Sequence, residues 1–169
     1  MIHLRQLPWL LLLVAVATSA TARDKDHFSV KLGTLQHENP AYDPAINLGL
    51  TVGGKLMDGK YLSLGLQLEI NTSVVEGETS TVRKDWEMDT HALYTSLYIG
   101  ERHYLKLKAG YSDWQVRYDT EAERNGNGLS WGVGYGYPLD NGRTLELEYT
   151  LLSDDEDYGI NYISLGYYF

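Results

Sequence analysis

Apolar and polar residues alternate with a period of two through most of this chain. The alternation is clearest over residues 128–137, where Gly and Ser separate large apolar or aromatic residues, namely Leu129, Trp131, Val133, Tyr135 and Tyr137. Successive side chains of a β-strand point to opposite faces, so this pattern predicts a strand with one apolar face. No helical period of any length is present, and the sequence therefore predicts an all-β fold.

Eight such runs are separated by turn residues. They cover residues 28–34, 46–53, 61–71, 88–99, 104–112, 128–137, 144–151 and 158–169. Asp58-Gly59 predicts a tight hairpin turn, and residues 100–103 and 138–143, which contain Asp140-Asn141-Gly142, predict two more. We expect an irregularity near Asp113, after which Trp114, Val116 and Tyr118 continue the apolar face of the fifth run.

The facing of the fourth run is ambiguous. Leu93, Leu97 and Ile99 can lie on the outer apolar face with Tyr94 and Tyr98 inside, or the reverse. We favour the first arrangement.

The residues opposite the apolar face indicate what that face contacts. They include Gly in most runs and only a few charges, which suits the narrow interior of an eight-stranded barrel better than a surface in water. Tilted runs of about 9–11 residues also suffice to cross a bilayer. We therefore predict an eight-stranded antiparallel up-and-down transmembrane β-barrel. The alternative is a soluble periplasmic β-barrel with the reverse facing, which would bind a small apolar ligand inside.

The lengths of the connections predict the orientation of this barrel. The second, fourth and sixth connections are short. The others, at residues 37–45, 72–87, 119–127 and 153–157, are on the whole longer and carry most of the loop charge. Short turns in the periplasm and longer loops outside are typical of a barrel inserted from the periplasm.

The N-terminus predicts export. Arg5 precedes an apolar stretch, Leu7 to Ala17, and Ala20-Thr21-Ala22 resembles a cleavage site. The apolar stretch is too short to cross a membrane as a helix. We expect residues 1–22 to be a cleaved signal peptide and residues 23–169 to form one barrel domain.

Composition narrows the choice of partners. The net charge is −9, with 14 Lys and Arg against 23 Asp and Glu, and the chain has no Cys. An acidic protein does not suit nucleic acid, because phosphate binding needs an excess of cations. Without Cys the chain forms no disulfide and no thiolate metal site. We expect no cofactor.

Charged residues on the inner face form a balanced set. If the strand facings hold, Lys31, Lys106 and Lys108 share the interior with Glu69, Glu146 and Glu148. Unpaired charges inside a lumen would be costly, so we expect a cross-barrel network of ion pairs. We also expect two outward aromatic girdles. One comprises Phe28, Tyr104, Tyr137, Tyr167 and Phe169, and the other comprises Tyr111, Trp114, Trp131 and Tyr149.

The last strand places Ile163, Leu165, Tyr167 and Phe169 on one face. This ending, with the fifth-run segment of residues 104–111, resembles the small eight-stranded outer-membrane β-barrel proteins of the OmpA and OmpX type. The resemblance covers residues 26–169. It implies an integral protein of the Gram-negative cell outer membrane, porin-like only in architecture. It also implies that the four named residues are read by the barrel-assembly machinery, and that the barrel, a monomer, contacts outer-membrane lipids and lipopolysaccharide.

Catalysis is the main rival to a structural or surface-interaction role. A lipid A deacylase needs Ser and His together on a lipid-facing strand, and here only His91, near Thr95 and Ser96, suggests such a group. A lipid A palmitoyltransferase would carry an amphipathic helix before its first strand, for which residues 23–27 are too few. The acidic run Asp154 to Asp157 lacks the spacing of a dedicated calcium loop. We therefore expect no enzymatic activity, and little or no ion conduction through a filled interior.

Overall fold

The computed structural model describes residues 26–37, 42–78, 85–118, 123–140, 142–152 and 159–169. Regular structure in these residues is entirely β-strand. The strands are β1 (Asp26–His37), β2 (Ala45–Asp58), β3 (Leu62–Val75), β4 (Gly77–Glu78), β5 (Asp85–Ile99), β6 (Tyr104–Tyr118), β7 (Arg124–Pro138), β8 (Thr144–Leu152) and β9 (Ile160–Tyr168). Among the described residues, no helix is long and apolar enough to span a membrane.

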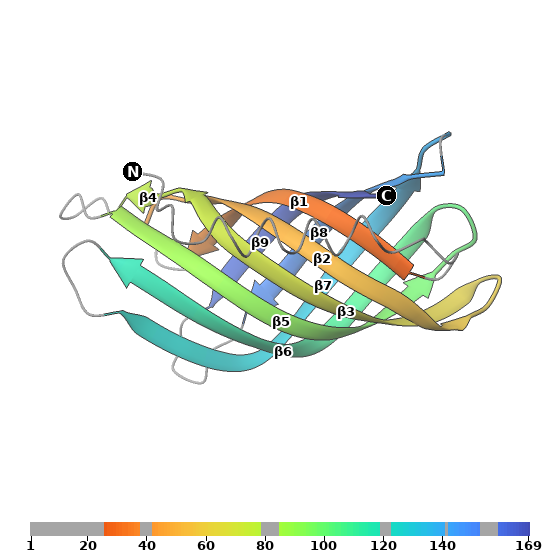
Figure 1. The fold of residues 1–169 in the computed structure, drawn as a ribbon, viewed down its shortest axis with the longest axis horizontal. Coiled ribbons are helices and arrows are strands. Elements are labelled where there is room, and N and C mark those ends of the chain that lie inside the picture. Colours follow the sequence, from red (N-terminus) through yellow and green to blue (C-terminus); the bar gives the residue numbers. More distant parts are fainter. Residues whose placement is uncertain (1–25, 38–41, 79–84, 119–122, 141, 153–158) are drawn as a thin grey trace.

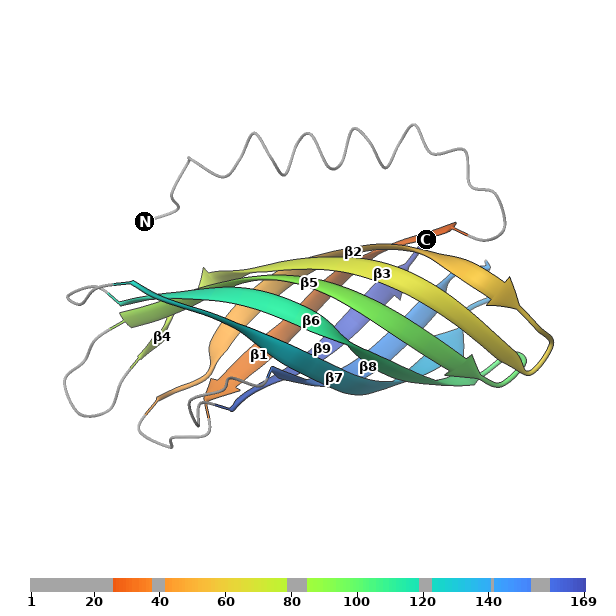
Figure 2. The same cartoon turned by 90° about the horizontal axis from the view of Figure 1, so that it is seen from below.

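Antiparallel pairing closes these strands into a barrel. Each long strand pairs with its neighbour in the chain, β1 pairs with β9, and β3 pairs with β5. The two-residue strand β4 adds only to the start of β5 and lies outside the closed ring. The result is the predicted eight-stranded antiparallel up-and-down barrel, seen from two sides in Figures 1 and 2.

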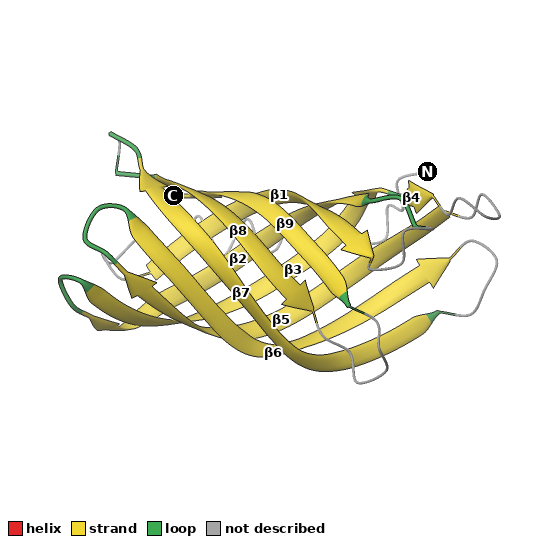
Figure 3. Cartoon of the chain, turned by 180° about the vertical axis from the view of Figure 1, so that it is seen from behind, coloured by secondary structure: helices red, strands yellow, loops and turns green. Residues whose placement is uncertain are grey.

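The two ends of the barrel differ. The turn end holds the connections β2–β3, β5–β6 and β7–β8, together with the start of β1 and the end of β9; these connections are green in Figure 3. Gly100 turns the chain there with a φ of 137°, and its N–H donates to the carbonyl of Tyr61 at 2.9 Å. Only Gly adopts such a φ without strain. The loop end is the opposite one, where β1 leads to β2 and β3 leads to β5.

Strands at the loop end are longer than the alternation predicts. β3 continues to Val75 and β5 begins at Asp85, so much of the segment 72–87 expected to be a loop is strand. Polar residues on both faces obscure the period here. Thr72, for example, lies opposite Asp89 and donates to its carboxylate at 2.6 Å.

The expected irregularity near Asp113 is absent from β6, which is regular throughout. Asp113 lies opposite His91 on one side and Asn127 on the other, without a register shift. The parity of the strand is therefore unchanged, and Trp114 and Val116 face the interior, with 8% and 4% of their surfaces exposed. The expectation that they continue the outer apolar face was wrong.

The apolar face looks outward, as predicted for a membrane barrel. Leu129 is 74% exposed and Leu165 53%, while Lys31 and Glu146 are fully buried. β5 takes the favoured facing, because Leu93 is 56% exposed and Tyr94 only 1%. Water would penalise such a continuous apolar surface, whereas lipid does not. The reverse facing expected of a soluble ligand-binding barrel is not found.

Candidate functional site

The lumen collects the charged side chains of four strands into one layer. Lys31 comes from β1, Glu69 from β3, Lys106 and Lys108 from β6, and Glu146 and Glu148 from β8. None is more than 3% exposed. These six residues, called the ion cluster below, are the ones that the sequence assigned to the interior, and the fold brings all six into contact.

Glu148 is the hub of the ion cluster. Its Oε1 accepts from the Nζ atoms of Lys31 at 2.8 Å and Lys108 at 2.7 Å, and its Oε2 accepts from Lys106 at 2.5 Å. All three lysines therefore meet on one carboxylate. Such a junction is stable in a low-dielectric interior only when every charge keeps a partner.

The other two carboxylates complete the charge balance. Glu69 Oε2 accepts from Lys31 at 2.7 Å and Lys108 at 3.1 Å. Glu146 accepts from Lys106 and from the hydroxyl groups of Tyr104 and Tyr168, each at 2.8 Å. Three positive and three negative groups from β1, β3, β6 and β8 thus meet across the lumen.

Glycines in the barrel wall make room for this layer. A Cβ added to Gly132 would lie 2.9 Å from Cε of Lys108, and one added to Gly166 would lie 3.3 Å from Cγ of Lys31. The inner glycines of β7 therefore leave space for Lys108 at Gly132 and for Glu146 and Glu148 at Gly134.

Beyond the ion cluster, toward the loop end, the lumen is filled by apolar side chains. This apolar plug consists of Leu35, Ala45, Trp86, Met88, Trp114, Val116, Leu152, Ile160 and Tyr162. The indole N–H of Trp86 donates to the carbonyl of Asp43 at 3.0 Å and so keeps a partner. Sequence reasoning missed the plug. Unbroken parity from Lys106 through Trp114 to Val116 was the signal that would have revealed it.

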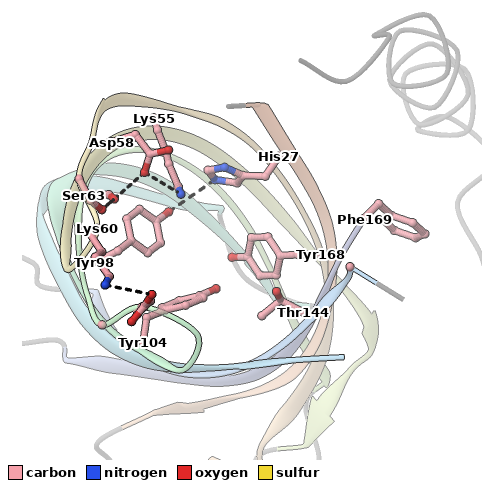
Figure 4. Close-up of a pocket in the computed structure, with 14 residues that line it drawn as sticks. His27, Lys55, Asp58, Lys60, Ser63, Tyr98, Tyr104, Thr144, Tyr168 and Phe169 are labelled. Carbon is pink, nitrogen blue, oxygen red and sulfur yellow. Dashed lines mark hydrogen bonds and ion pairs between the residues drawn. The ribbon is translucent and has the colours of Figure 1, made fainter. Parts of the chain in front are cut away.

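At the turn end the lumen opens into a cavity of about 540 Å³, which we call the cup. Figure 4 shows the rings of His27, Tyr98, Tyr104 and Tyr168 around its opening, while Phe169 lies outside the wall. The lumen thus has three layers, namely the cup, the ion cluster and the apolar plug.

Two members of the expected aromatic girdles are placed differently by the structure. Tyr104 belongs to the inner face and bonds Glu146, and Trp114 belongs to the apolar plug. Tyr137, Tyr111 and Trp131 do lie on the outer face, each more than half exposed. Both misplaced residues have the parity of Lys106, which the sequence analysis had already assigned to the interior.

The terminal residues lie outside the barrel beside its closing seam. Ile163, Leu165 and Phe169 are 39%, 53% and 58% exposed. The Phe169 N–H donates to the carbonyl of Phe28 at 3.0 Å, and the two rings stack with centroids 5.7 Å apart. Tyr167 meets Phe169 edge-on at 5.0 Å. The last residue is therefore fixed against the first strand.

The residues weighed for catalysis do not gather. His91 is exposed on the outer face of β5, whereas Ser96 is buried in the lumen and donates to Gln67 at 2.8 Å. Thr95 shares the face of His91 but is four residues away, which is about 13 Å along a strand. Within the described part of the chain, no group of three His, Asp or Glu side chains could hold a metal ion. The acidic run 154–157 and the predicted leader, residues 1–22, lie outside the described residues.

Comparisons with solved structures identify barrels of the same shape. Ail of Yersinia pestis, solved in complex with the heparin analogue sucrose octasulfate, superposes with a TM-score of 0.59 at 11% identity, covering 86% of this chain and 97% of that one. OprG from Pseudomonas aeruginosa gives 0.53 at 12%, covering 86% and 96%. The outer membrane enzyme PagL gives 0.52 at 12%, covering 84% and 97%. At these identities the likeness concerns the fold alone.

Sequence comparison supplies the family. No curated protein matches the chain. Residues 9–169, however, match the family model described as the outer membrane protein beta-barrel domain, and the fold has the outward apolar face that such a domain needs. The chain therefore belongs to the outer membrane protein β-barrel domain family and is a protein of the cell outer membrane.

Proposed function

We propose that this protein is a closed, non-conducting barrel with a structural and surface-contact role in the outer membrane, and that it catalyses no reaction. The observation that carries the proposal is the filling of the lumen. An ion entering from the turn end meets the ion cluster, whose carboxylates are already bonded to lysines. Behind it stands the apolar plug, which offers a passing ion no polar replacement for its hydration shell.

Conductance in planar lipid bilayers tests the proposal. The wild-type protein is expected to show no stepwise conductance at moderate voltage. A variant in which Trp86 and Trp114 become Ala and Lys106 and Glu148 become Ser opens both layers and serves as the positive control. Steady conductance steps from the wild-type barrel would contradict a structural role and indicate a channel.

The outer surface supports membrane lipids, including lipopolysaccharide, as partners. Leu66, Leu107 and Leu147 are each 40% or more exposed on strands around the barrel, so acyl chains can cover them without cost. We include the barrel-assembly machinery as a second partner, acting on Ile163, Leu165, Tyr167 and Phe169. The protein is proposed to be a monomer, since eight strands already close the sheet and leave no long edge for a second copy.

The charge of the loop end favours surface contact with some partners over others. Glu87 and Asp89 share Arg117, whose guanidinium Nη2 lies 2.8 Å from Asp89, and Asp113 and Glu123 are exposed nearby on β6 and before β7. Ail binds a sulfated heparin analogue. An acidic loop end does not favour such a polyanion here, and contact with cationic or neutral surfaces fits better.

A lipid-modifying enzyme is the second candidate, because His91 lies opposite Asp113 on the outer face and one similar barrel, PagL, is an enzyme. The distance of Thr95 from His91 and the burial of Ser96 argue against it. Mass spectrometry of lipid A from cells with and without the protein decides the matter. Identical lipid A supports the non-catalytic role. A mass change that is lost in His91→Ala but kept in His103→Ala would overturn it.

A further inference from the structure

The outer surface of the barrel carries different chemistry toward its two ends. Toward the loop end, exposed tyrosines bond neutral amides, and Tyr111, for example, donates to the side-chain oxygen of Asn127. At the turn end, exposed aromatic rings lie beside basic side chains instead. Lys60 Nζ, for example, is 5.0 Å from the ring centroid of Tyr61. A lipid headgroup therefore meets cations on aromatic rings at the turn end only where a basic residue faces outward.

Arg143 is a basic residue of the turn end that faces outward. Gly142 and Thr144, its neighbours in the chain, line the cup, whereas the exposed Arg143 contacts aromatic rings of the outer face. Two carboxylates of the same end, Asp58 and Glu101, line the cup instead. The positive charge of Arg143 is therefore presented to the lipid side of the barrel wall.

Two rings and a hydroxyl group hold the guanidinium of Arg143 in place. Its Nη1 donates to the hydroxyl of Tyr167 at 2.8 Å, and its Cζ lies 5.6 Å and 5.7 Å from the ring centroids of Tyr167 and Phe169. Phe169 is itself stacked on Phe28, and Figure 4 shows it outside the barrel wall. A guanidinium has five N–H donors and can hold Tyr167 and a phosphate at the same time. An arginine positioned in this way loses little freedom when an anion arrives, which favours binding.

An apolar surface begins directly beside Arg143 and continues toward the middle of the barrel. Leu145 lies opposite Tyr167, and the next outward pair is Leu147 opposite Leu165. Leu147 and Leu165 are 57% and 53% exposed. A cation at one end of an apolar strip matches a phospholipid, in which a phosphate is joined to acyl chains. A free phosphate would use the cation alone.

We propose that Arg143, held by Tyr167 and Phe169, binds the headgroup of an anionic phospholipid. The acyl chains of this lipid cover Leu147 and Leu165. The site lies in the leaflet at the turn end, which is the periplasmic leaflet in the predicted orientation. A net negative headgroup is favoured over a zwitterionic one, because the cation of the latter offsets the attraction of its phosphate to the guanidinium. This proposal rests on the lipid contact proposed above, and it adds the charge of the headgroup and the residues that select it.

Lipid titration followed by native mass spectrometry tests the proposal. The folded barrel in an uncharged detergent receives dioleoyl phosphatidylglycerol or dioleoyl phosphatidylcholine, which share their acyl chains and differ in net charge. Phosphatidylglycerol is expected to bind about fivefold more tightly, the effect of one arginine near an anionic lipid surface, and added salt should reduce the preference. Arg143→Gln should remove most of it. Lys55→Gln removes the same charge from a residue that lines the cup and should leave the preference unchanged.

Further variants and a second measurement locate the site. Arg143→Lys keeps the charge but loses the planar set of donors, so it should retain an intermediate preference. Asp140→Asn removes an exposed carboxylate from the same turn and should increase the preference. Phosphatidylglycerol should shift the amide resonances of Thr144 and Tyr167 more than phosphatidylcholine does.

The outcomes separate this proposal from the lipid contact on which it rests. An unchanged preference in Arg143→Gln, or an equal loss in Lys55→Gln, would overturn the assignment to Arg143. Equal affinity of the wild type for the two lipids would overturn the selection of an anionic headgroup and leave the lipid contact itself intact. No bound lipid of either kind would contradict that contact as well.

Discussion

Replacing Glu148 by Gln should destabilise the barrel more than any other single change of charge in the ion cluster. The substitution keeps the shape of the side chain and removes the charge that Lys31, Lys106 and Lys108 share. Each lysine retains another carboxylate, Glu69 or Glu146, but the buried layer then carries three positive and two negative charges. The interior gains one uncompensated charge with little access to water.

The structure sets the size of the effect. Removing one partner of a buried ion pair costs about 3–5 kcal/mol, since the other charge stays buried without compensation. Glu146→Gln should cost less, about 1.5–3 kcal/mol, because Glu146 accepts from only one lysine and the Gln oxygen can still accept from one of the two hydroxyl groups, that of Tyr104 or that of Tyr168. The surface variant Lys60→Gln loses an exposed pair worth about 0–1 kcal/mol.

Urea unfolding from lipid vesicles, followed by tryptophan fluorescence, measures the three variants. The expected order of free energies of unfolding is Lys60→Gln, then Glu146→Gln, then Glu148→Gln as the least stable. Adding Lys108→Met to Glu148→Gln leaves two buried ion pairs, Lys31 with Glu69 and Lys106 with Glu146, and should recover part of the loss. If Glu148→Gln is as stable as Lys60→Gln, the carboxylate is hydrated and the reasoning about the ion cluster fails.

Three further predictions concern the plug, the wall and the terminus. Trp114→Ala should lower the free energy of unfolding by about 3–5 kcal/mol, because it leaves a cavity in the apolar plug, as the same urea titration would measure. Gly136→Val should destabilise the barrel, because it displaces the ring of Tyr104, which lies against Gly136. Gly142→Asn in the β7–β8 turn should be tolerated, and thermal unfolding in detergent compares the two variants. Deleting Phe169 should reduce the yield of assembled barrel in cells, visible as loss of the heat-dependent gel shift, while the signal of a refolded sample persists.

The fold could be predicted largely because lipid imposes a strict period on the outer face. β7, with alternating Gly and aromatic residues, shows that constraint directly, and its facing was assigned correctly. The same alternation predicted the ion cluster, since Lys106 and Glu146 lie between apolar residues in the sequence. Short turns containing Gly or Asp marked the ends of the strands.

Apolar character alone could not predict the interior near the loop end, where the unbroken alternation of β6 was the only guide. There the strands extend beyond the apolar belt, so the outer face becomes polar while Trp114 and Val116 fill the inside. An apolar residue then no longer implies the lipid face. The placement of Tyr104 in the outer girdle was wrong for a related reason. A tyrosine is equally suited to a lipid interface and to a buried hydrogen bond, here with Glu146.

Glu146 links two layers of the lumen, the ion cluster and the cup. One of its oxygens accepts from Lys106 and from Tyr168, and the other accepts from Tyr104. The carboxylate that balances a buried lysine therefore also positions two rings of the cup. A hydroxyl bonded to a buried charge resists rotation more than one bonded to water, because the alternative leaves that charge without a partner. The shape of the cup thus depends on the integrity of the ion cluster, and a sequence change that repacked one would alter the other.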